Sequence, residues 1–186
     1  MNYELKPEML ESEHIKLRAV EPSDLELLYE WENATEIWGV SDTLTPFSRF
    51  TLGQYIETSR MDLFEAKQLR LMVDARTDDD VMVPIGAVDL FDYSPRHRRA
   101  GVGILIYDQS YRQKGYAKLA LDLLIEYAFE MLELHQLYCN VAVDNEGSFR
   151  LFKKLNFEVA GIKREWSKTP AGWSDEYLMQ LINNRN

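Results

Sequence analysis

The sequence predicts an α+β domain built from about seven strands and about four helices. Segments in which apolar residues alternate with period two, as in half-buried strands, are interspersed with segments in which they recur every three or four positions, as on one side of a helix. The chain also has enough material for a buried core, because 46% of its 186 residues are hydrophobic and 28% are charged. Since the sequence contains no repeat, low-complexity tract or linker, we expect one domain over residues 1–186.

The N-terminal third predicts a strand, two helices and a second strand. Residues 14–20 alternate polar and apolar, as a half-buried strand does. The segment 21–24, Glu-Pro-Ser-Asp, then signals the start of a helix, because proline is tolerated in the first turn. Residues 33–47 lack periodicity and contain a glycine and a proline, which predicts a loop, with room for a short turn of helix, of the kind that often shapes a pocket. A second helix over 51–65 and a strand over 68–73 follow.

The middle of the chain predicts a turn and then a β-hairpin. Residues 74–80 end in three consecutive aspartates, and because their spacing is not that of an EF-hand loop we interpret them as a solvated turn and not as a metal site. Residues 81–91 are mostly apolar and predict a strand. After a polar link, the segment 99–106 completes the hairpin.

The C-terminal part predicts two helices and three strands. A long helix begins at about Lys118, because its apolar residues form one stripe. The stripe consists of Leu121, Leu124, Ile125, Ala128 and Leu132. Residues 135–143 alternate as a strand, and residues 146–154 form a shorter helix that Asn145 can cap. Two final strands follow, over residues 157–166 and 175–182.

The charge and the single cysteine exclude several classes of function. Acidic residues outnumber basic ones 31 to 21, which weighs against a nucleic-acid binder and favours a cationic substrate. No stretch approaches the roughly 18 apolar residues of a membrane span, and the first residues contain no apolar leader, so we expect a cytoplasmic protein with no membrane partner. Cys139 is in phase with apolar neighbours and is interpreted as a core residue. As the only cysteine, it excludes an internal disulfide or a cysteine-rich metal site.

The segment 112–117, Arg-Gln-Lys-Gly-Tyr-Ala, is the most informative motif. It lies between the apolar run 103–106 and the long helix, so it predicts a strand, a loop and a helix in succession. Amides at the start of a helix have no intrahelical acceptors and carry partial positive charge, so they can bind a phosphate or pyrophosphate. Gly115 lets the backbone come close to such a group.

The pattern Arg-x-x-Gly-x-Ala in this setting resembles the coenzyme A pyrophosphate loop of the GNAT superfamily of N-acetyltransferases. Segments 143–148 and 152–158 resemble further landmarks of that family, and the order of predicted elements is similar over residues 14–182. The chain looks most like the spermidine N-acetyltransferase and ribosomal-protein N-terminal acetyltransferase branches, on segments 97–100 and 172–177. The resemblance implies the GNAT fold, whose central, mixed and mostly antiparallel sheet splays apart between strands 4 and 5.

The resemblance also implies acetyl-CoA as the cofactor and places its two ends. The pantetheine arm would pair with exposed backbone of the fourth strand, and the pyrophosphate would lie on the glycine loop, with no metal required. The implied cofactor-binding residues are Ile104, Leu105, Ile106, Arg112, Gln113, Lys114, Gly115, Tyr116, Ala117, Asn145 and Phe152. Asn145 has two interpretations that can hold together, a contact to the cofactor arm and a simple helix N-cap.

Catalysis requires a neutral amine to attack the thioester carbonyl, so a base or a water chain must take a proton. The backbone amide of Leu105 or of Ile106 would stabilise the oxyanion that develops. Two positions depart from the family pattern: Phe152, which has no titratable proton, replaces the usual tyrosine acid, and Gly101 replaces the usual glutamate of the fourth strand. Solvent-assisted transfer stays chemically feasible, because a thiolate is a tolerable leaving group.

Asp89 and Tyr138 are the candidate catalytic side chains. Asp89 is a carboxylate in an otherwise apolar strand, an environment that can tune its basicity, and its alternative role is to pair with a neighbour such as Arg99. Tyr138 lies on the fifth strand on the face opposite Cys139, where it could supply a phenol near the cofactor sulfur. Simple packing of its ring is the alternative.

The acceptor amine is expected between the loop after the first helix and the final hairpin. Both regions carry acidic residues, which are Glu32, Glu36 and Asp42 in the first and Glu165, Asp175 and Glu176 in the second. Such charge would hold a polyamine or a protein N-terminus by pairing with ammonium groups, and the alternative is ordinary solvated surface acid. Trp31, Trp38 and Trp173 form either a cation-binding wall or part of the core.

We therefore expect an acetyl-CoA-dependent N-acetyltransferase that transfers an acetyl group to a primary amine by direct attack in a ternary complex. The acceptor is a polyamine-like small molecule or a protein N-terminus, nucleic acid and membrane are not partners, and a homodimer is compatible with the sequence. The alternative is a non-catalytic acyl-CoA-binding or regulatory module of the same fold, which Phe152 and Gly101 would permit.

Overall fold

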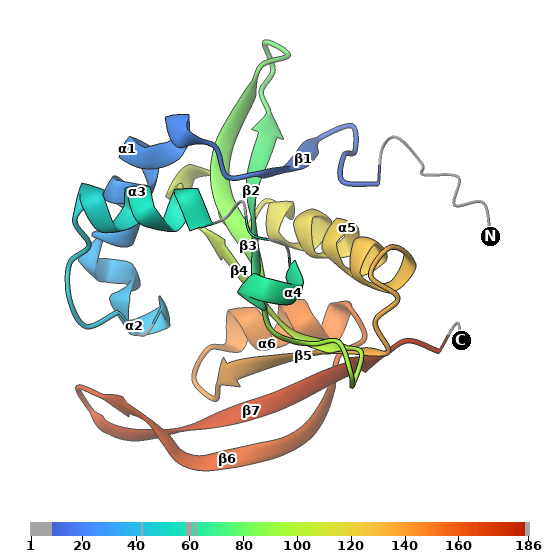
Figure 1. The fold of residues 1–186 in the computed structure, drawn as a ribbon. Coiled ribbons are helices and arrows are strands. Elements are labelled where there is room, and N and C mark those ends of the chain that lie inside the picture. The colour runs from blue at the N-terminus through green and yellow to red at the C-terminus, as the bar shows by residue number, and fades with distance from the viewer. Residues whose placement is uncertain (1–8, 42, 59–60, 62, 185–186) are drawn as a thin grey trace.

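A computed structural model of the chain describes residues 9–41, 43–58, 61 and 63–184. Its centre is a seven-stranded sheet with the strand order β1-β2-β3-β4-β5-β7-β6 (Figure 1). The strands are β1 (Ile15–Ala19), β2 (Leu69–Arg76), β3 (Met82–Ser94), β4 (Arg99–Ile106), β5 (Gln136–Ala142), β6 (Glu158–Thr169) and β7 (Gly172–Ile182). Neighbouring strands are antiparallel except β4 and β5, which are parallel. The predicted mixed, mostly antiparallel sheet is therefore confirmed.

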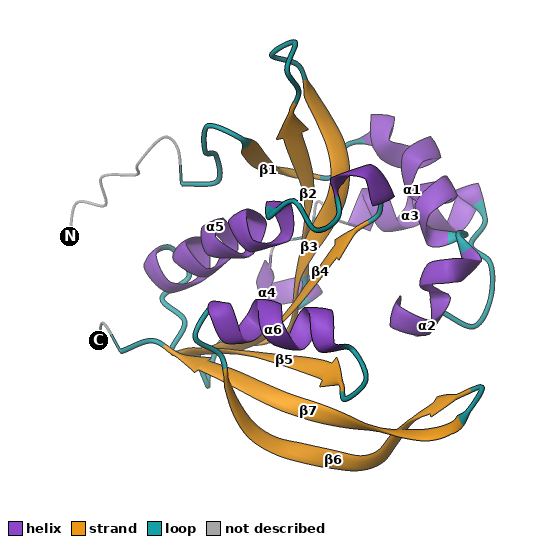
Figure 2. Ribbon diagram, turned by 180° about the vertical axis from the view of Figure 1, so that it is seen from behind, coloured by secondary structure: helices purple, strands orange, loops and turns teal. Residues whose placement is uncertain are grey.

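Helices pack on both faces of this sheet. They are α1 (Leu25–Glu32), α2 (Trp38–Ser41), α3 (Arg49–Thr58), α4 (Leu63–Ala66), α5 (Tyr116–Glu130) and α6 (Glu146–Lys154), with short 3-10 segments η1 (Pro22–Asp24), η2 (Thr35–Ile37) and η3 (Gln109–Tyr111). Helices α5 and α6 lie together on one face (Figure 2), over the larger hydrophobic cluster. On the other face, Leu28 of α1 and Ile56 of α3 form a second cluster with Met72 of β2. Among the described residues, no helix is both long and apolar enough to cross a membrane.

Three expected elements differ from the structure. The single helix expected over 51–65 is two helices, α3 and α4. Helix α5 begins before Lys118, because Gly115, with φ of +92°, already forms its N-cap. The link between the strands expected over 157–166 and 175–182 is shorter than expected, because β6 and β7 both extend into it and leave only a tight turn. The three aspartates form a turn as expected, and the described residues contain no group of side chains that could hold a metal ion.

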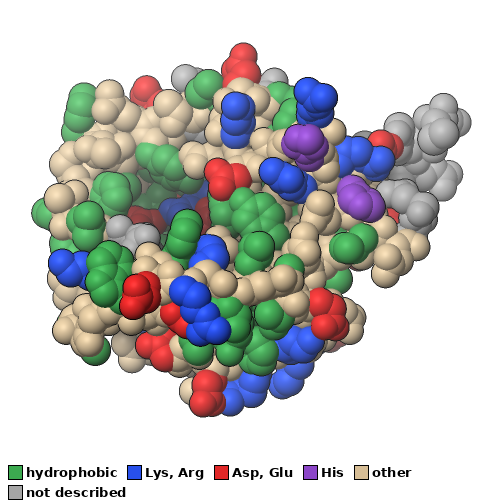
Figure 3. All heavy atoms as spheres, turned by 90° about the horizontal axis from the view of Figure 1, so that it is seen from below, with side chains coloured by type: hydrophobic (Ala, Val, Ile, Leu, Met, Phe, Trp, Pro, Cys, Tyr) green, Lys and Arg blue, Asp and Glu red, His purple; other side chains and the backbone are tan. Residues whose placement is uncertain are grey.

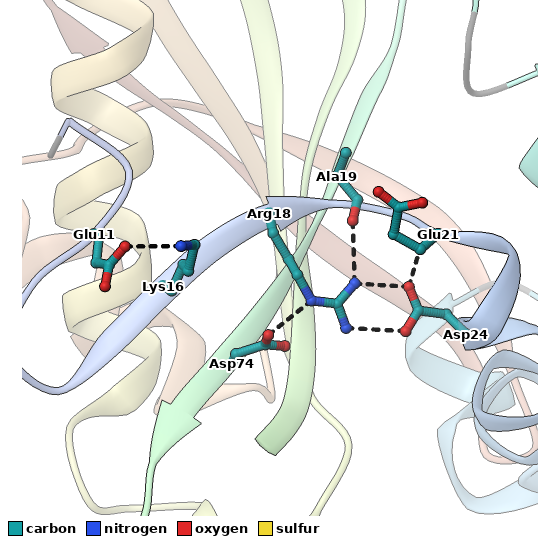
Figure 4. A network of polar contacts seen from close by, with 7 residues as sticks. All are labelled: Glu11, Lys16, Arg18, Ala19, Glu21, Asp24 and Asp74. Atoms are coloured by element: carbon teal, nitrogen blue, oxygen red, sulfur yellow. Dashed lines mark hydrogen bonds and ion pairs between the residues drawn. The ribbon is translucent and has the colours of Figure 1, made fainter. Parts of the chain in front are cut away.

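A buried ion-pair network fixes the start of α1 (Figure 4). Arg18 of β1 donates from its two terminal nitrogens to the carboxylate of Asp24, at 2.8 and 2.9 Å, and from Nε to Asp74 of β2 at 2.7 Å. Burial acts to raise the pKa of Asp24, but the hydrogen bonds from Arg18 and from the Glu21 amide outweigh it, so this pKa lies below its ordinary value. The network ties β1, β2 and the first helical turn together.

Candidate active site

The sheet opens between β4 and β5. These strands pair only at Arg99–Gly101, which lie opposite Gln136–Tyr138. From Val102 to Ile106, β4 continues its pairing with β3, while no register with β5 exists. One backbone edge of β4 therefore faces an opening, where an extended ligand can pair with it as a strand would.

Backbone alternation decides which groups of β4 face this opening. The amide of Tyr107 donates to Ile85 of β3 at 2.9 Å, and because successive backbone groups of a strand point to opposite sides, the amide of Leu105 also points toward β3. The groups of Ile104 and Ile106 point to the opening, and Arg112 Nε donates there to the Ile106 carbonyl at 2.8 Å. Of the two oxyanion donors considered from the sequence, the geometry favours Ile106 and disfavours Leu105.

The glycine loop lies where the sequence predicts it, at the start of α5. Gly115 is the N-cap residue in the left-handed region, and no side chain caps the first amides of the helix. A Cβ built on Gly115 would meet no atom within 4 Å, so the space in front of the loop is open. Arg112 holds the loop to β4 through the carbonyls of Ile106 and Tyr107, and Lys114 Nζ lies 5.8 Å from the Tyr111 ring.

The remaining predicted cofactor residues are Asn145, which caps α6, and Phe152, which lies within it. Asn145 Oδ1 accepts a hydrogen bond from the Ser148 amide at 3.0 Å, so its capping role is confirmed. Phe152 is buried, and its ring packs edge-on against Phe157 with the centroids 5.1 Å apart. Its predicted contact with the cofactor stays a prediction.

Asp89 lies over one face of β4, at a place where two glycines leave that face without side chains. Gly101 and Gly103 share one face of β4, and a Cβ built on Gly101 would overlap the ring of Phe91 from β3. A Cβ built on Gly103 would lie 3.9 Å from Asp89 Oδ2. Two β3 side chains thus occupy the volume that β4 leaves empty, and one of them is a carboxylate.

Arg70 connects this carboxylate to helix α1. Its Nε donates to Asp89 Oδ1 at 2.7 Å, and one terminal nitrogen donates to Glu32 Oε1 at 2.6 Å. The Tyr107 hydroxyl donates to the same Glu32 oxygen at 3.2 Å, and its ring stacks on Trp31 with centroids 4.4 Å apart. Burial, followed by the negative charge of Glu32, raises the pKa of Tyr107 far above its ordinary value. The result is a partly buried cluster with two carboxylates and one guanidinium.

The partner of Asp89 is therefore Arg70 and not Arg99, which lies opposite Ser94. Sequence reasoning missed Arg70, although a signal exists: it is a charge in an apolar strand, and antiparallel pairing of β2 with β3 sets it directly opposite Asp89. Tyr107 follows the end of β4 and gives no comparable signal.

Tyr138 lies where the opening begins, and its side chain contacts β3. It lies opposite Gly101, at the last paired position of β4 and β5. Its hydroxyl donates to Asp92 Oδ2 at 3.0 Å, its ring packs edge-on against Phe91, and burial with this hydrogen bond raises its pKa to about 12. These contacts support the packing role. Cys139, on the other face, is buried as expected, and burial raises the pKa of its thiol to about 12.

The acidic residues expected near the acceptor have different environments. Glu32 is buried in the Arg70 cluster, Glu36 and Glu165 are exposed, and Asp42 lies outside the described residues. In the hairpin, Asp175 pairs with Arg164 and Glu176 pairs with Lys163. Seen from below (Figure 3), the surface is hollowed on the side of α1 to α3, and acidic and basic side chains are visible in its depth.

The three tryptophans do not form one wall. Trp31 stacks on Tyr107, and Trp38 donates from its ring nitrogen to the Glu32 carbonyl at 3.0 Å. Trp173 is exposed at the start of β7. Only the first two therefore border the Arg70 cluster.

A separate cavity of about 690 Å³ lies between α5, the end of α6 and the end of β7. Lys118 and Lys154 are among its lining residues. Because it contains none of the predicted cofactor or catalytic residues and lies on the α5 side of the sheet, we do not assign it to the active site.

Comparison with known proteins gives three kinds of similarity. A family model described as an acetyltransferase (GNAT) domain matches residues 14–158. The uncharacterized N-acetyltransferase p20 of Bacillus licheniformis is 26% identical over 178 residues, covering 94% of this chain and 96% of that protein. The spermidine N(1)-acetyltransferase of Escherichia coli strain K12 is 27% identical over 150 residues, covering 79% of this chain and 74% of that protein.

Solved structures show the same architecture. The crystal structure of spermidine N-acetyltransferase from Vibrio cholerae in complex with CoA and spermine superimposes with a TM-score of 0.80 at 24% identity, covering 92% of this chain and 96% of that one. A crystal structure of a probable acetyltransferase gives a TM-score of 0.78 at 25% identity, covering 94% and 96% of the two chains.

Proposed function

Because this chain belongs to the GNAT acetyltransferase family and is an N-acetyltransferase that uses acetyl-CoA, we propose that its acceptor is a polyamine-like primary amine, attacked directly in a ternary complex. The observation that carries the proposal is the open edge of β4 beside the uncapped start of α5, next to a cluster with excess negative charge. Relatives named for spermidine acetylation support a polyamine over a protein N-terminus.

The residues fit an acetyl-CoA molecule laid along this edge. The backbone groups of Ile104 that face the opening would pair with the pantetheine arm, and the amides at the start of α5 would bind the pyrophosphate. Arg112 and Lys114 would add positive charge beside it. Bound in this way, acetyl-CoA supplies an acyl carbon already activated as a thioester, and the Ile106 amide would stabilise negative charge on its carbonyl oxygen.

Two measurements test the proposal in order. Calorimetric titration with acetyl-CoA is expected to show specific binding, and release of free CoA thiol is then followed over spermidine, spermine, monoamines and a short peptide with a free N-terminus. Faster turnover of the polyamines supports the proposal. A preference for the peptide would contradict the acceptor, and binding without turnover of any amine would favour the non-catalytic module.

We expect Phe152→Tyr to raise kcat by about tenfold and to leave the affinity for acetyl-CoA unchanged, because it restores a proton donor for the leaving sulfur. Steady-state kinetics beside calorimetry checks this. Phe157→Tyr is the matched control, since Phe157 packs against Phe152 and is also buried. Loss of acetyl-CoA binding in Phe152→Tyr would instead show that the ring packs too tightly against the cofactor for a hydroxyl.

A further inference from the structure

The face of β4 next to the opening carries a carboxylate that comes from the neighbouring strand. Gly101 and Gly103 contribute no side chains there, and Asp89 Oδ2 lies over Gly103. Gly103 is adjacent in sequence to Ile104, whose backbone groups point to the opening. The carboxylate thus lies over the residue next to Ile104, and Ile104 belongs to the backbone edge on which we propose that acetyl-CoA lies.

The hydrogen bonds of Asp89 leave one of its oxygens available. Oδ1 accepts the short bond from Arg70 Nε at 2.7 Å, while Oδ2 has only a longer contact of 3.3 Å with a terminal nitrogen of the same guanidinium. The side chain is 30% exposed, so a ligand can reach it. Since a carboxylate offers about four lone-pair positions, Oδ2 has capacity for a further donor.

Arg70 is held from the opposite side, which fixes the orientation of Asp89. Its bond to Glu32 uses a nitrogen that does not contact Asp89, and Glu32 is only 9% exposed. The guanidinium also lies 5.7 Å from the Tyr55 ring. One guanidinium between two carboxylates leaves a net negative charge.

Resting on the proposed function, we propose that Asp89 binds the ammonium group of the acceptor and accepts its proton, with Arg70 and Glu32 as positioning residues. A carboxylate from β3 thereby performs a task for which β4 has no side chain. The net negative charge makes the site selective for acceptors that carry further positive charge, which is the polyamine class.

The protons and bonds of the transfer balance. Asp89 takes one proton from the acceptor ammonium, which gives a neutral amine. The amine nitrogen forms a bond to the acyl carbon while the bond from that carbon to sulfur breaks. Of the three ammonium protons, one stays on the amide product, one ends on the CoA thiol, and one leaves from Asp89 to solvent.

Asp89→Asn tests the assignment, because it preserves shape and the hydrogen bond from Arg70 while removing the charge. With spermidine, kcat/KM near pH 7 is expected to fall by about 100-fold or more, and acetyl-CoA affinity is expected to stay unchanged. The loss of kcat/KM in Asp89→Asn is expected to become smaller as the pH approaches about 10, the ordinary pKa range of an alkylammonium. At that pH the amine loses its proton without a protein base. Asp80→Asn is the matched control, since Asp80 also pairs with an arginine of β2 but at the far turn.

Three results would overturn the assignment: activity of Asp89→Asn within twofold of the wild type, an equal loss in Asp80→Asn, or a defect that stays constant up to pH 10. Glu32→Gln tests positioning and is expected to raise KM for spermidine more than it lowers kcat, whereas equal KM values would contradict that role. Different results would contradict the proposed function and the role of Asp89. A wild type that binds acetyl-CoA and acetylates no amine contradicts the proposed function, whereas an active wild type with an equally active Asp89→Asn contradicts only the role of Asp89.

Discussion

Substitution of Gly115 by valine is expected to abolish acetyl-CoA binding in a protein that still folds. Gly115 has φ of +92°, where a residue with a Cβ costs about 1–2 kcal/mol, and its missing side chain leaves the space in front of the α5 amides open. Valine would fill that space and shift the loop. Charge-assisted hydrogen bonds contribute about 1.5–3 kcal/mol each, so losing two of them weakens binding by more than about 100-fold. Calorimetric titration measures the loss.

Gly172→Val is the control for Gly115→Val, because it brings similar backbone strain but lies outside the proposed pyrophosphate site. Gly172 also has a positive φ, and a Cβ there would meet no atom within 4 Å, but it lies at the β6–β7 turn. We expect this variant to lose stability as Gly115→Val does and to bind acetyl-CoA normally. A folded Gly115→Val protein with unchanged affinity would show that the loop does not bind the pyrophosphate.

Arg18→Met is expected to lower the free energy of unfolding by about 3–5 kcal/mol. The substitution leaves the carboxylates of Asp24 and Asp74 buried without their cation, and breaking one partner of a buried pair is costly because the remaining charge is uncompensated. Urea denaturation followed by circular dichroism measures the effect. Arg49→Met is the control, since Arg49 makes a similar forked contact to Glu26 on the exposed surface. A comparable change in both variants would contradict the explanation.

Arg18→Met is also expected to change how the stability of the protein depends on pH. In the folded protein the pKa of Asp24 is lowered from 3.8, so its stabilisation is present above that pH and is lost as the pH falls toward the lower folded value. Without Arg18 its hydrogen bonds and its charge no longer lower this pKa, and the Glu21 amide alone opposes the burial that raises it. Acid unfolding of Arg18→Met is therefore expected to begin at a higher pH than that of the wild type.

Most of the fold follows from local sequence patterns. The predicted bounds of β4 and α6 coincide with the structure, because a turn or cap residue marks each start and the apolar period is clear. The error in the helix expected over 51–65 has the opposite origin: helix-forming composition continued past the point where α3 ends at Thr58. Helix propensity is a local property of the sequence, and it does not indicate where tertiary packing ends a helix.

The site was predictable only where it depends on backbone. The glycine loop follows from its motif, the open edge of β4 is what the resemblance to the GNAT family implies, and the structure has both. The Arg70 cluster joins α1, β2, β3 and the end of β4, so it depends on strand register that a single sequence does not supply. For the same reason Arg99 was the wrong partner for Asp89. The single domain, the cytoplasmic location and the homodimer stay predictions.

The contact between Phe91 and Gly101 also restricts how this chain can evolve. A Cβ at position 101 overlaps the Phe91 ring, and that ring is in turn packed against Tyr138. A glutamate therefore cannot be acquired at position 101 by one tolerated substitution, and loss of the ring alone would leave a void over a bare backbone. The two positions must change together. An engineer who wants a carboxylate at position 101 therefore needs a double substitution, and each of the two changes made alone is expected to be harmful.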